Sequence, residues 1–275
     1  RKHYDEKTFQ VHAIREYASL GIEGRADFGR LAADYFNLSR REFMGRYFRG
    51  REMEVSRPLT RAAHRRIVAE LDNREQQAII TAEPGANMLV LAGPGSGKTR
   101  VVVHRCAWLL KVERIPATRI LVLCFNRSAA IDLRRRLAAL AGKCATEVTV
   151  QTYHGFALRL LGGSFADGSR GQEAEREELK QLVPRAADLL EGRTDLAGLE
   201  AGAARDRLLA EFSHILIDEY QDIDGEQYRL ISAIAGRTER SEETKLAIMA
   251  VGDDDQNIYA FRHTSVEFIH RFAQD

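Results

Sequence analysis

Residues 88–100 read MLVLAGPGSGKTR, a short apolar run followed by a glycine-rich turn that ends in Lys98 and Thr99. The run has the length of a buried strand, and the segment from Lys98 to about Leu110 is expected to form a helix. A glycine-rich turn between a strand and a helix is the setting of a phosphate-binding P-loop, where backbone N–H groups and the helix dipole face the phosphates. The alternative is a glycine-rich turn that binds no ligand.

Four further apolar runs occur after residue 100, and each is four to eight residues long without strict alternation. Strands that are buried on both faces of a parallel sheet have this pattern, and helix-favouring stretches separate the runs. The sequence therefore predicts an α/β fold with a doubly wound parallel sheet, preceded by a small helical region. The four runs lie at 120–125, 147–152, 214–218 and 246–251.

The P-loop residues have distinct expected roles. Lys98 would contact the β- and γ-phosphates of a nucleotide, and the Thr99 hydroxyl would coordinate Mg²⁺. The usual pattern begins with Gly, whereas this loop begins with Ala92. The predicted phosphate-binding set comprises Ala92, Gly93, Pro94, Gly95, Ser96, Gly97, Lys98 and Thr99.

Two adjacent acids follow the predicted strand at 214–218, within the sequence HILIDEYQD. Adjacent carboxylates at a strand end are often simple surface groups. Together with the P-loop, however, they predict a nucleoside-triphosphatase site. Asp218 would hold Mg²⁺, and Glu219 would polarise the attacking water as a general base.

A third polar segment, VGDDDQNIYAFR, starts at the end of the predicted strand at 246–251. Gln256 is placed where it could contact a γ-phosphate. The alternatives are a solvated aspartate-rich turn or a metal cluster, although the spacing lacks the alternation of an EF-hand loop.

The composition is that of an ordinary globular protein, with 44% hydrophobic and 29% charged residues. No apolar run approaches the ~18 residues that span a bilayer, so we expect no membrane association. Three cysteines without a CxxC pair favour reduced, buried thiols and a cytoplasmic protein. The charged start at Arg1 shows no signal peptide, and we expect the chain to be a piece of a longer protein.

The net charge of +1 combines two unlike parts. Residues 1–70 carry 15 Lys and Arg against 10 Asp and Glu, a balance of +5, and the remainder carries 26 against 30, a balance of −4. Nine arginines lie within 40–66 beside Phe43, Tyr47 and Phe48. This patch could follow a phosphate backbone and stack bases, or it could be a solvated helical face whose aromatic residues lie in a core.

In order along the chain, these motifs resemble motifs I, II and III of the UvrD/Rep/PcrA family of superfamily 1 helicases. Residues 73–79 (NREQQAI) are similar to the family's Q motif, in which Gln76 or Gln77 would read the adenine, and Arg100 matches a position near the nucleotide base. Residues 123–137 and 151–157 are similar to motifs Ia and Ib. The resemblance covers about 71–275.

The resemblance implies a RecA-like ATP-binding motor domain at 71–275 that uses ATP and Mg²⁺. It also implies 3′-to-5′ movement along single-stranded DNA or a single-strand/duplex junction. A helical, arginine-rich module would occupy 1–70, and a helical insertion about 160–210. Phe125 and Phe261 would stack on bases unless they pack in the core. The expected DNA-binding set comprises Phe125, Asn126, Thr152, His154, Phe261 and Arg262.

The sequence also departs from the family pattern. Motif III ends in FRHT in place of an aromatic-Arg-Gly-Ala sequence, and motif Ia reads CFNRSAA in place of TFTNKAA. Motifs IV to VI and the second motor domain with its arginine fingers would lie beyond residue 275. We therefore expect weak ATP binding, slow hydrolysis and no unwinding by this chain alone.

Residues 32–50 are similar to segments that precede UvrD-type motors in some large bacterial proteins that also carry a RecQ-like helicase. The resemblance thus implies a bacterial, nucleoid-associated protein, and it implies no particular oligomer. Two alternatives remain open. One is a DNA-stimulated ATPase that switches or displaces a partner without unwinding, and the other is a non-catalytic DNA- or protein-binding module.

Overall fold

The computed structural model describes residues 10, 13–18, 20, 27–49, 61–162, 172–194, 211–236, 245–253, 268 and 272. Two compact units divide the chain, Arg1–His64 and Arg65–Asp275. The predicted site residues Gln256, Phe261 and Arg262 lie outside the described residues.

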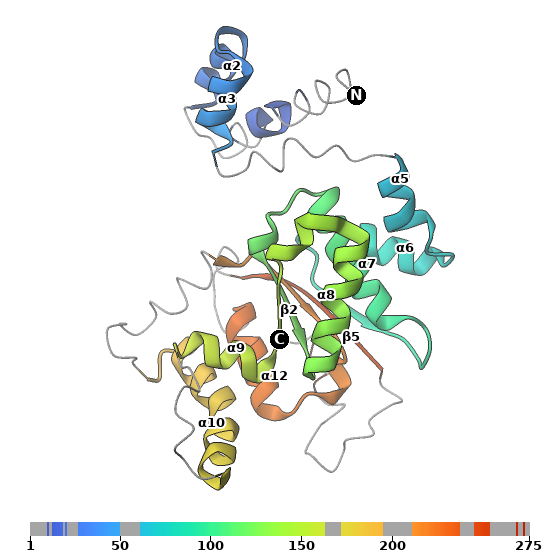
Figure 1. Cartoon of the computed structure of the whole chain (residues 1–275), viewed down its shortest axis with the longest axis vertical. Coiled ribbons are helices and arrows are strands. Elements are labelled where there is room, and N and C mark those ends of the chain that lie inside the picture. Colours follow the sequence, from blue (N-terminus) through green and yellow to red (C-terminus); the bar gives the residue numbers. More distant parts are fainter. Residues whose placement is uncertain are drawn as a thin grey trace. The chain divides into compact units, whose positions relative to one another are not determined.

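The larger unit contains a five-stranded parallel sheet (Figure 1). The predicted strands are confirmed at all five positions, and the strand order is β1-β5-β4-β2-β3. The P-loop strand β1 therefore lies beside β5, which comes last of the five along the chain. The strands are β1 (Met88–Leu91), β2 (Ile120–Cys124), β3 (Thr149–Thr152), β4 (His214–Ile217) and β5 (Ala247–Gly252).

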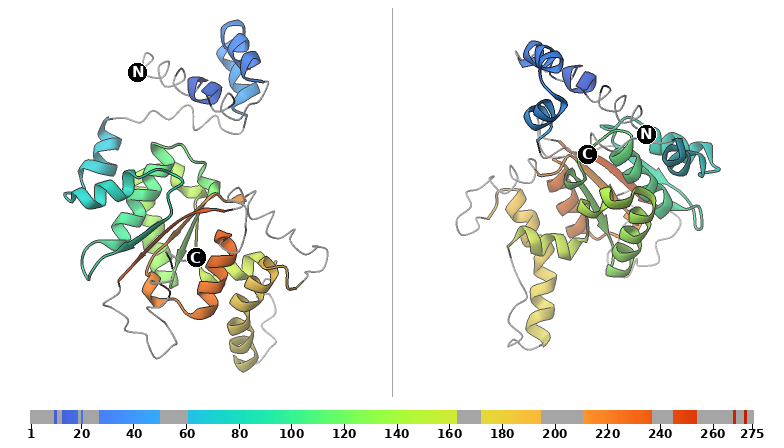
Figure 2. Two further views of the ribbon diagram at one scale, coloured as in Figure 1. Left: turned by 180° about the vertical axis from the view of Figure 1, so that it is seen from behind. Right: turned by 45° about the horizontal axis from the view of Figure 1, so that its top comes forward.

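Helices cover both faces of this sheet (Figure 2). Because successive side chains of a strand point to opposite faces, Leu121 and Leu123 pack in one core with α9, α10 and α12, whereas Val122 packs in a second core with α7 and α8. The predicted α/β class is confirmed. The helices of this unit are α6 (Arg74–Thr81), α7 (Lys98–Lys111), α8 (Arg127–Ala141), α9 (Tyr153–Leu160), α10 (Gln172–Leu190) and α12 (Gly225–Ala235). A π-helical segment lies at η1 (Arg65–Ala69), and short 3-10 helices lie at η2 (Ala117–Arg119), η3 (Gly142–Glu147) and η4 (Tyr220–Asp222).

All three cysteines are buried and free, as the sequence indicates. Burial raises the pKa of the Cys124 thiol to about 12, so this group stays a thiol at neutral pH. Among the described helices, none combines the length and apolar character that crossing a membrane requires.

The smaller unit contains α2 (Asp27–Asn37) and α3 (Arg40–Tyr47), with α5 (Arg61–His64) at its end. Ser39 and Glu42 form a capping box at the start of α3. Phe43 and Phe48 are buried in this unit's core, and the Tyr47 hydroxyl donates to Asp34. Phe43 and Phe48 therefore pack inside the unit, as the solvated-face alternative expects, whereas Tyr47 is half-buried.

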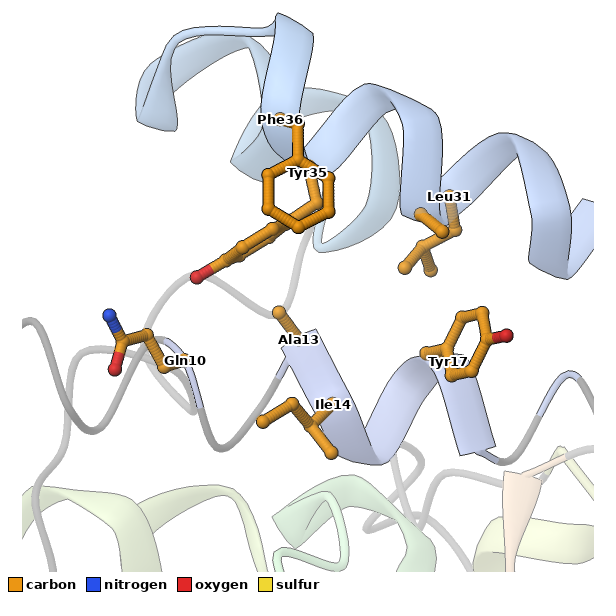
Figure 3. Close-up of a pocket in the computed structure, with 8 residues that line it drawn as sticks. Gln10, Ala13, Ile14, Tyr17, Leu31, Tyr35 and Phe36 are labelled. Carbon is orange, nitrogen blue, oxygen red and sulfur yellow. The ribbon is translucent and has the colours of Figure 1, made fainter.

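An apolar pocket lies between the helical residues 13–18 and α2 in this unit (Figure 3). Ile14 and Phe36 contribute to its wall and are exposed, the latter by 84%. Its lining residues are Gln10, Ala13, Ile14, Tyr17, Leu31, Ala32, Tyr35 and Phe36.

His214 begins β4 as a buried, neutral imidazole. Its Nδ1 lies 2.8 Å from Ser213 Oγ, and its Nε2 lies 3.1 Å from the carbonyl oxygen of Pro84. Burial lowers the pKa of His214 to about 4. In the unfolded chain this group protonates below about pH 6.5, while in the folded chain it stays neutral until about pH 4.

Acidification from pH 7 to pH 4 is therefore expected to reduce the free energy of unfolding by about 3 kcal/mol through His214. Urea unfolding at several pH values, compared between the unmodified chain and His214→Gln, measures this contribution. His64→Gln, at an exposed position, is the matched control. An equally steep pH dependence in His214→Gln would contradict the prediction.

Candidate functional site

The P-loop has the backbone geometry that its glycines predict. Gly95 and Gly97 adopt φ values of 71° and 89°, in the left-handed region that favours glycine. Gly97 precedes α7 without a side-chain cap, so the first N–H groups of this helix point into the loop without a capping acceptor. Such a helix start is suited to bind phosphate.

Lys98 is held over the loop by three oxygen atoms. Its Nζ donates to the carbonyl oxygens of Ala92 and Gly93, at 3.0 Å and 3.2 Å, and to Asp253 Oδ2 at 2.9 Å. Lys98 is 9% exposed, and Asp253 is fully buried at the end of β5. The positive charge of the P-loop is thus paired with a carboxylate from the neighbouring strand.

Asp218 follows β4 directly and faces the start of α7. It is 2% exposed and lies beside the side chain of Thr99, which favours the ionised form of the carboxylate. Burial, with the neighbouring Glu219 charge, raises the pKa of Asp218 to about 6. Its Oδ1 is buried without a hydrogen-bond partner among the described residues.

Asp222 resembles Asp218 in these respects. Burial and the Glu219 charge raise its pKa to about 6, and its Oδ1 is buried without a partner among the described residues.

Within the described part of the chain, no group of three or more His, Cys, Asp or Glu side chains forms a metal site. The buried Asp218 Oδ1 and the nearby Thr99 hydroxyl nevertheless fit Mg²⁺, because this ion commonly keeps waters and phosphate oxygens as its further ligands.

Glu219 has an unusual backbone conformation, with φ 55° and ψ 51°. A non-glycine residue in this region costs of order 1 kcal/mol and is typical of functional sites. The side chain is half-buried, and its Oε2 accepts a hydrogen bond of 2.7 Å from Gln221 Nε2. The carboxylate is therefore oriented by a neighbour and accessible to water.

Gln76 lies in the first turn of α6, which Asn73 caps. Its Nε2 donates to the carbonyl oxygen of Ser96 at 2.7 Å, whereas Gln77 Nε2 donates to that of Leu71. Of the two candidates, Gln76 reaches the P-loop. Arg100 is exposed and donates to the carbonyl oxygen of Glu70 at 2.7 Å.

Four of the residues expected to bind DNA lie at or just after the ends of β2 and β3, at the same edge of the sheet as the P-loop. Phe125 is half-buried and His154 is exposed. Asn126 Oδ1 accepts from the Ala129 N–H at 2.8 Å at the start of α8, and Thr152 Oγ1 accepts from the Gly155 N–H at 3.2 Å at the start of α9. Asn126 and Thr152 are therefore helix caps in this structure.

Asn126→Ala is expected to lower the free energy of unfolding by about 0.5–2 kcal/mol, because it removes the cap of α8. Asn126→Ser keeps a capping oxygen and should retain most of this stability. Urea unfolding of both variants, with single-stranded DNA affinity measured in parallel, separates the cap from a DNA contact. Equal stability of Asn126→Ala and the unmodified chain would contradict the capping role.

Three site residues were not identified from the sequence, namely Gln221, Asp222 and Asp253. Gln221 and Asp222 belong to the DEYQD segment, and Asp253 is the first aspartate of GDDDQ. Their closeness in sequence to Glu219 and to the strand ends is the feature that could have indicated a place in the site. Their contacts depend on the pairing of β4 with β5.

Comparison with known proteins finds one matching family model and several similar DNA helicases. A family model described as an AAA domain matches residues 75–262. DNA helicase II of Salmonella typhimurium and of Escherichia coli are each 31% identical to this chain over 274 residues, covering 76% of the chain. ATP-dependent DNA helicase UvrD1 of Mycobacterium tuberculosis is 28% identical over 275 residues, covering 74% of the chain. The chain spans little more than a third of these relatives, 37% of the first two and 35% of the third.

Proposed function

The chain belongs to the UvrD-like superfamily 1 helicases through its AAA domain, and from this membership we propose that it is the ATP-binding half of an ATP-dependent DNA helicase or translocase. It acts on single-stranded DNA and moves 3′ to 5′. The observation that carries this proposal is the convergence of Lys98, Thr99, Asp218 and Glu219 at one edge of the sheet.

The nucleotide site assigns one task to each residue. The P-loop N–H groups and Lys98 bind the phosphates, and Lys98 then exchanges its carbonyl contacts for phosphate oxygens. Thr99 and Asp218 hold Mg²⁺, which neutralises phosphate charge when bound. Glu219 accepts a proton from the attacking water, and Gln76 contacts the adenine.

The DNA site extends from the ends of β2 and β3. Phe125 offers an apolar ring to a base, and the exposed side chain of His154 faces the DNA. A stacking contact requires no particular base, so binding is independent of sequence. Gln256 contacts the γ-phosphate, and Phe261 and Arg262 complete the DNA contacts.

A second motor domain of the same protein supplies the arginine finger. Such a residue typically raises turnover by ~10³–10⁵. The chain alone therefore hydrolyses ATP slowly and unwinds nothing.

Steady-state ATP turnover with and without single-stranded DNA tests the proposal. The chain is compared with a longer protein that continues through a second motor domain, and Lys98→Ala serves as the control in both. DNA-stimulated turnover by the longer protein is the expected result. If neither protein hydrolyses ATP while both still bind DNA, the helicase proposal is overturned in favour of a binding module. ATP turnover without strand separation would indicate an ATPase switch.

A further inference from the structure

Gln221 connects two segments of the nucleotide site. Its Nε2 donates to Glu219 Oε2 at 2.7 Å, and its Oε1 accepts from the Asp253 backbone N–H at 3.0 Å. The Gln221 side chain is 3% exposed, and its bond to the Asp253 N–H is buried, whereas its bond to Glu219 is partly buried. A glutamine amide has both a donor and an acceptor, which this position requires.

The backbone around Gln221 leaves little free space. A Cβ atom added to Gly252 would lie 3.1 Å from Gln221 Oε1 and 3.3 Å from Tyr220 Cβ. The end of β5 therefore approaches the segment after β4 closely. This approach brings the Asp253 N–H within reach of Gln221.

The bonds of Gln221 extend to the P-loop. Asp253, whose N–H Gln221 binds, also carries the carboxylate that pairs with Lys98 Nζ at 2.9 Å. One continuous chain of polar contacts thus runs from Glu219 through Gln221 and Asp253 to Lys98. It spans the ends of β4, β5 and β1.

We propose that Gln221 is a positioning residue for ATP hydrolysis, which holds the Glu219 carboxylate and the end of β5 in one hydrogen-bonded unit. The inference rests on the proposed function, since orientation of Glu219 matters only where it activates water. Glu219 has a left-handed backbone that is typical of functional sites, and the hydrogen bond that its carboxylate accepts within the described residues comes from Gln221. Gln221 takes Oε2 and thereby sets the direction in which the carboxylate faces the phosphates.

Three variants test the proposal. Gln221→Met keeps the side-chain volume and removes both bonds, whereas Gln221→Glu keeps the acceptor for Asp253 and removes the donor to Glu219. Gln227→Met is the matched control, because Gln227 is also a buried glutamine, at 6% exposure, and its Oε1 has no partner among the described residues. Each variant is compared with the unmodified chain for binding of a fluorescent ATP analogue with Mg²⁺, single-turnover hydrolysis and melting temperature.

Gln221→Met is expected to slow hydrolysis by about 10–100-fold, while its ATP affinity stays within about twofold. Gln221→Glu should be slowed as well, and Gln227→Met should not. The affinity for ADP with aluminium fluoride, which mimics the transition state, should fall together with the hydrolysis rate. This measurement decides the question even where hydrolysis is too slow to follow.

An unchanged rate and unchanged transition-state-analogue affinity in Gln221→Met would overturn the inference alone. A loss of ATP affinity as large as the loss of rate, or full activity of Gln221→Glu, would also overturn it. Absence of ATP binding by the unmodified chain would instead overturn the proposed function, and this inference with it.

Discussion

Glu219→Gln is expected to slow single-turnover ATP hydrolysis by about 10²–10⁴-fold while ATP remains bound. The amide cannot accept a proton from water at neutral pH, so the proposed general base is lost. Its oxygen can still accept the hydrogen bond from Gln221 Nε2, and the local fold is therefore retained. The variant should trap bound ATP.

Rapid mixing with radiolabelled ATP measures the rate, and filter binding measures retained nucleotide. Glu226→Gln is the matched control, since Glu226 lies on α12 with its side chain 52% exposed. Hydrolysis in Glu219→Gln at the rate of the unmodified chain would exclude Glu219 as the base. Loss of ATP binding in this variant would point to a structural role.

Lys98→Ala is expected to lower the free energy of unfolding of the nucleotide-free chain by about 3–5 kcal/mol. Lys98 and Asp253 form an ion pair in which the carboxylate is fully buried. Removal of the ammonium group breaks this buried ion pair, and breaking a buried pair by deleting one partner is strongly destabilising. A substitution usually regarded as purely functional should therefore also be structural.

Urea unfolding without nucleotide measures this loss. The double variant Lys98→Ala with Asp253→Asn removes the buried charge and should recover most of the stability. Arg135→Ala is a suitable control, because Arg135 pairs with Asp132 on an exposed surface and should contribute at most about 1 kcal/mol. Full stability of Lys98→Ala would show that the ion pair does not stabilise the fold.

Much of the fold was predictable because its signals are local. Each strand is a short apolar run. The P-loop glycines adopt positive φ values, a local property that glycine itself permits. Adjacent acids after a buried strand also make Asp218 and Glu219 candidates for the nucleotide site. In each case the relevant residues lie within a few positions of one another.

The contacts of Gln221 and Asp253 were not predictable in this way, because they depend on the strand order. The sheet places β5 between β1 and β4, and this brings residue 253 beside residues 98 and 221. An Asn or Thr directly before a helix is a strong capping signal, and Asn126 and Thr152 accept capping bonds at the positions where the family resemblance implies DNA contacts.

The pairing of β1 with β5 has a consequence for synthesis of the protein. Met88 is in register with Met249, and the Ala92 N–H donates to the carbonyl oxygen of Gly252. A nascent chain that ends before β5 lacks both this ladder and the carboxylate that pairs with Lys98. Contacts between residues so far apart in sequence form slowly. The ribosome must therefore translate about 150 residues after the P-loop before the loop acquires its native support, and nucleotide binding should arise late and abruptly during translation.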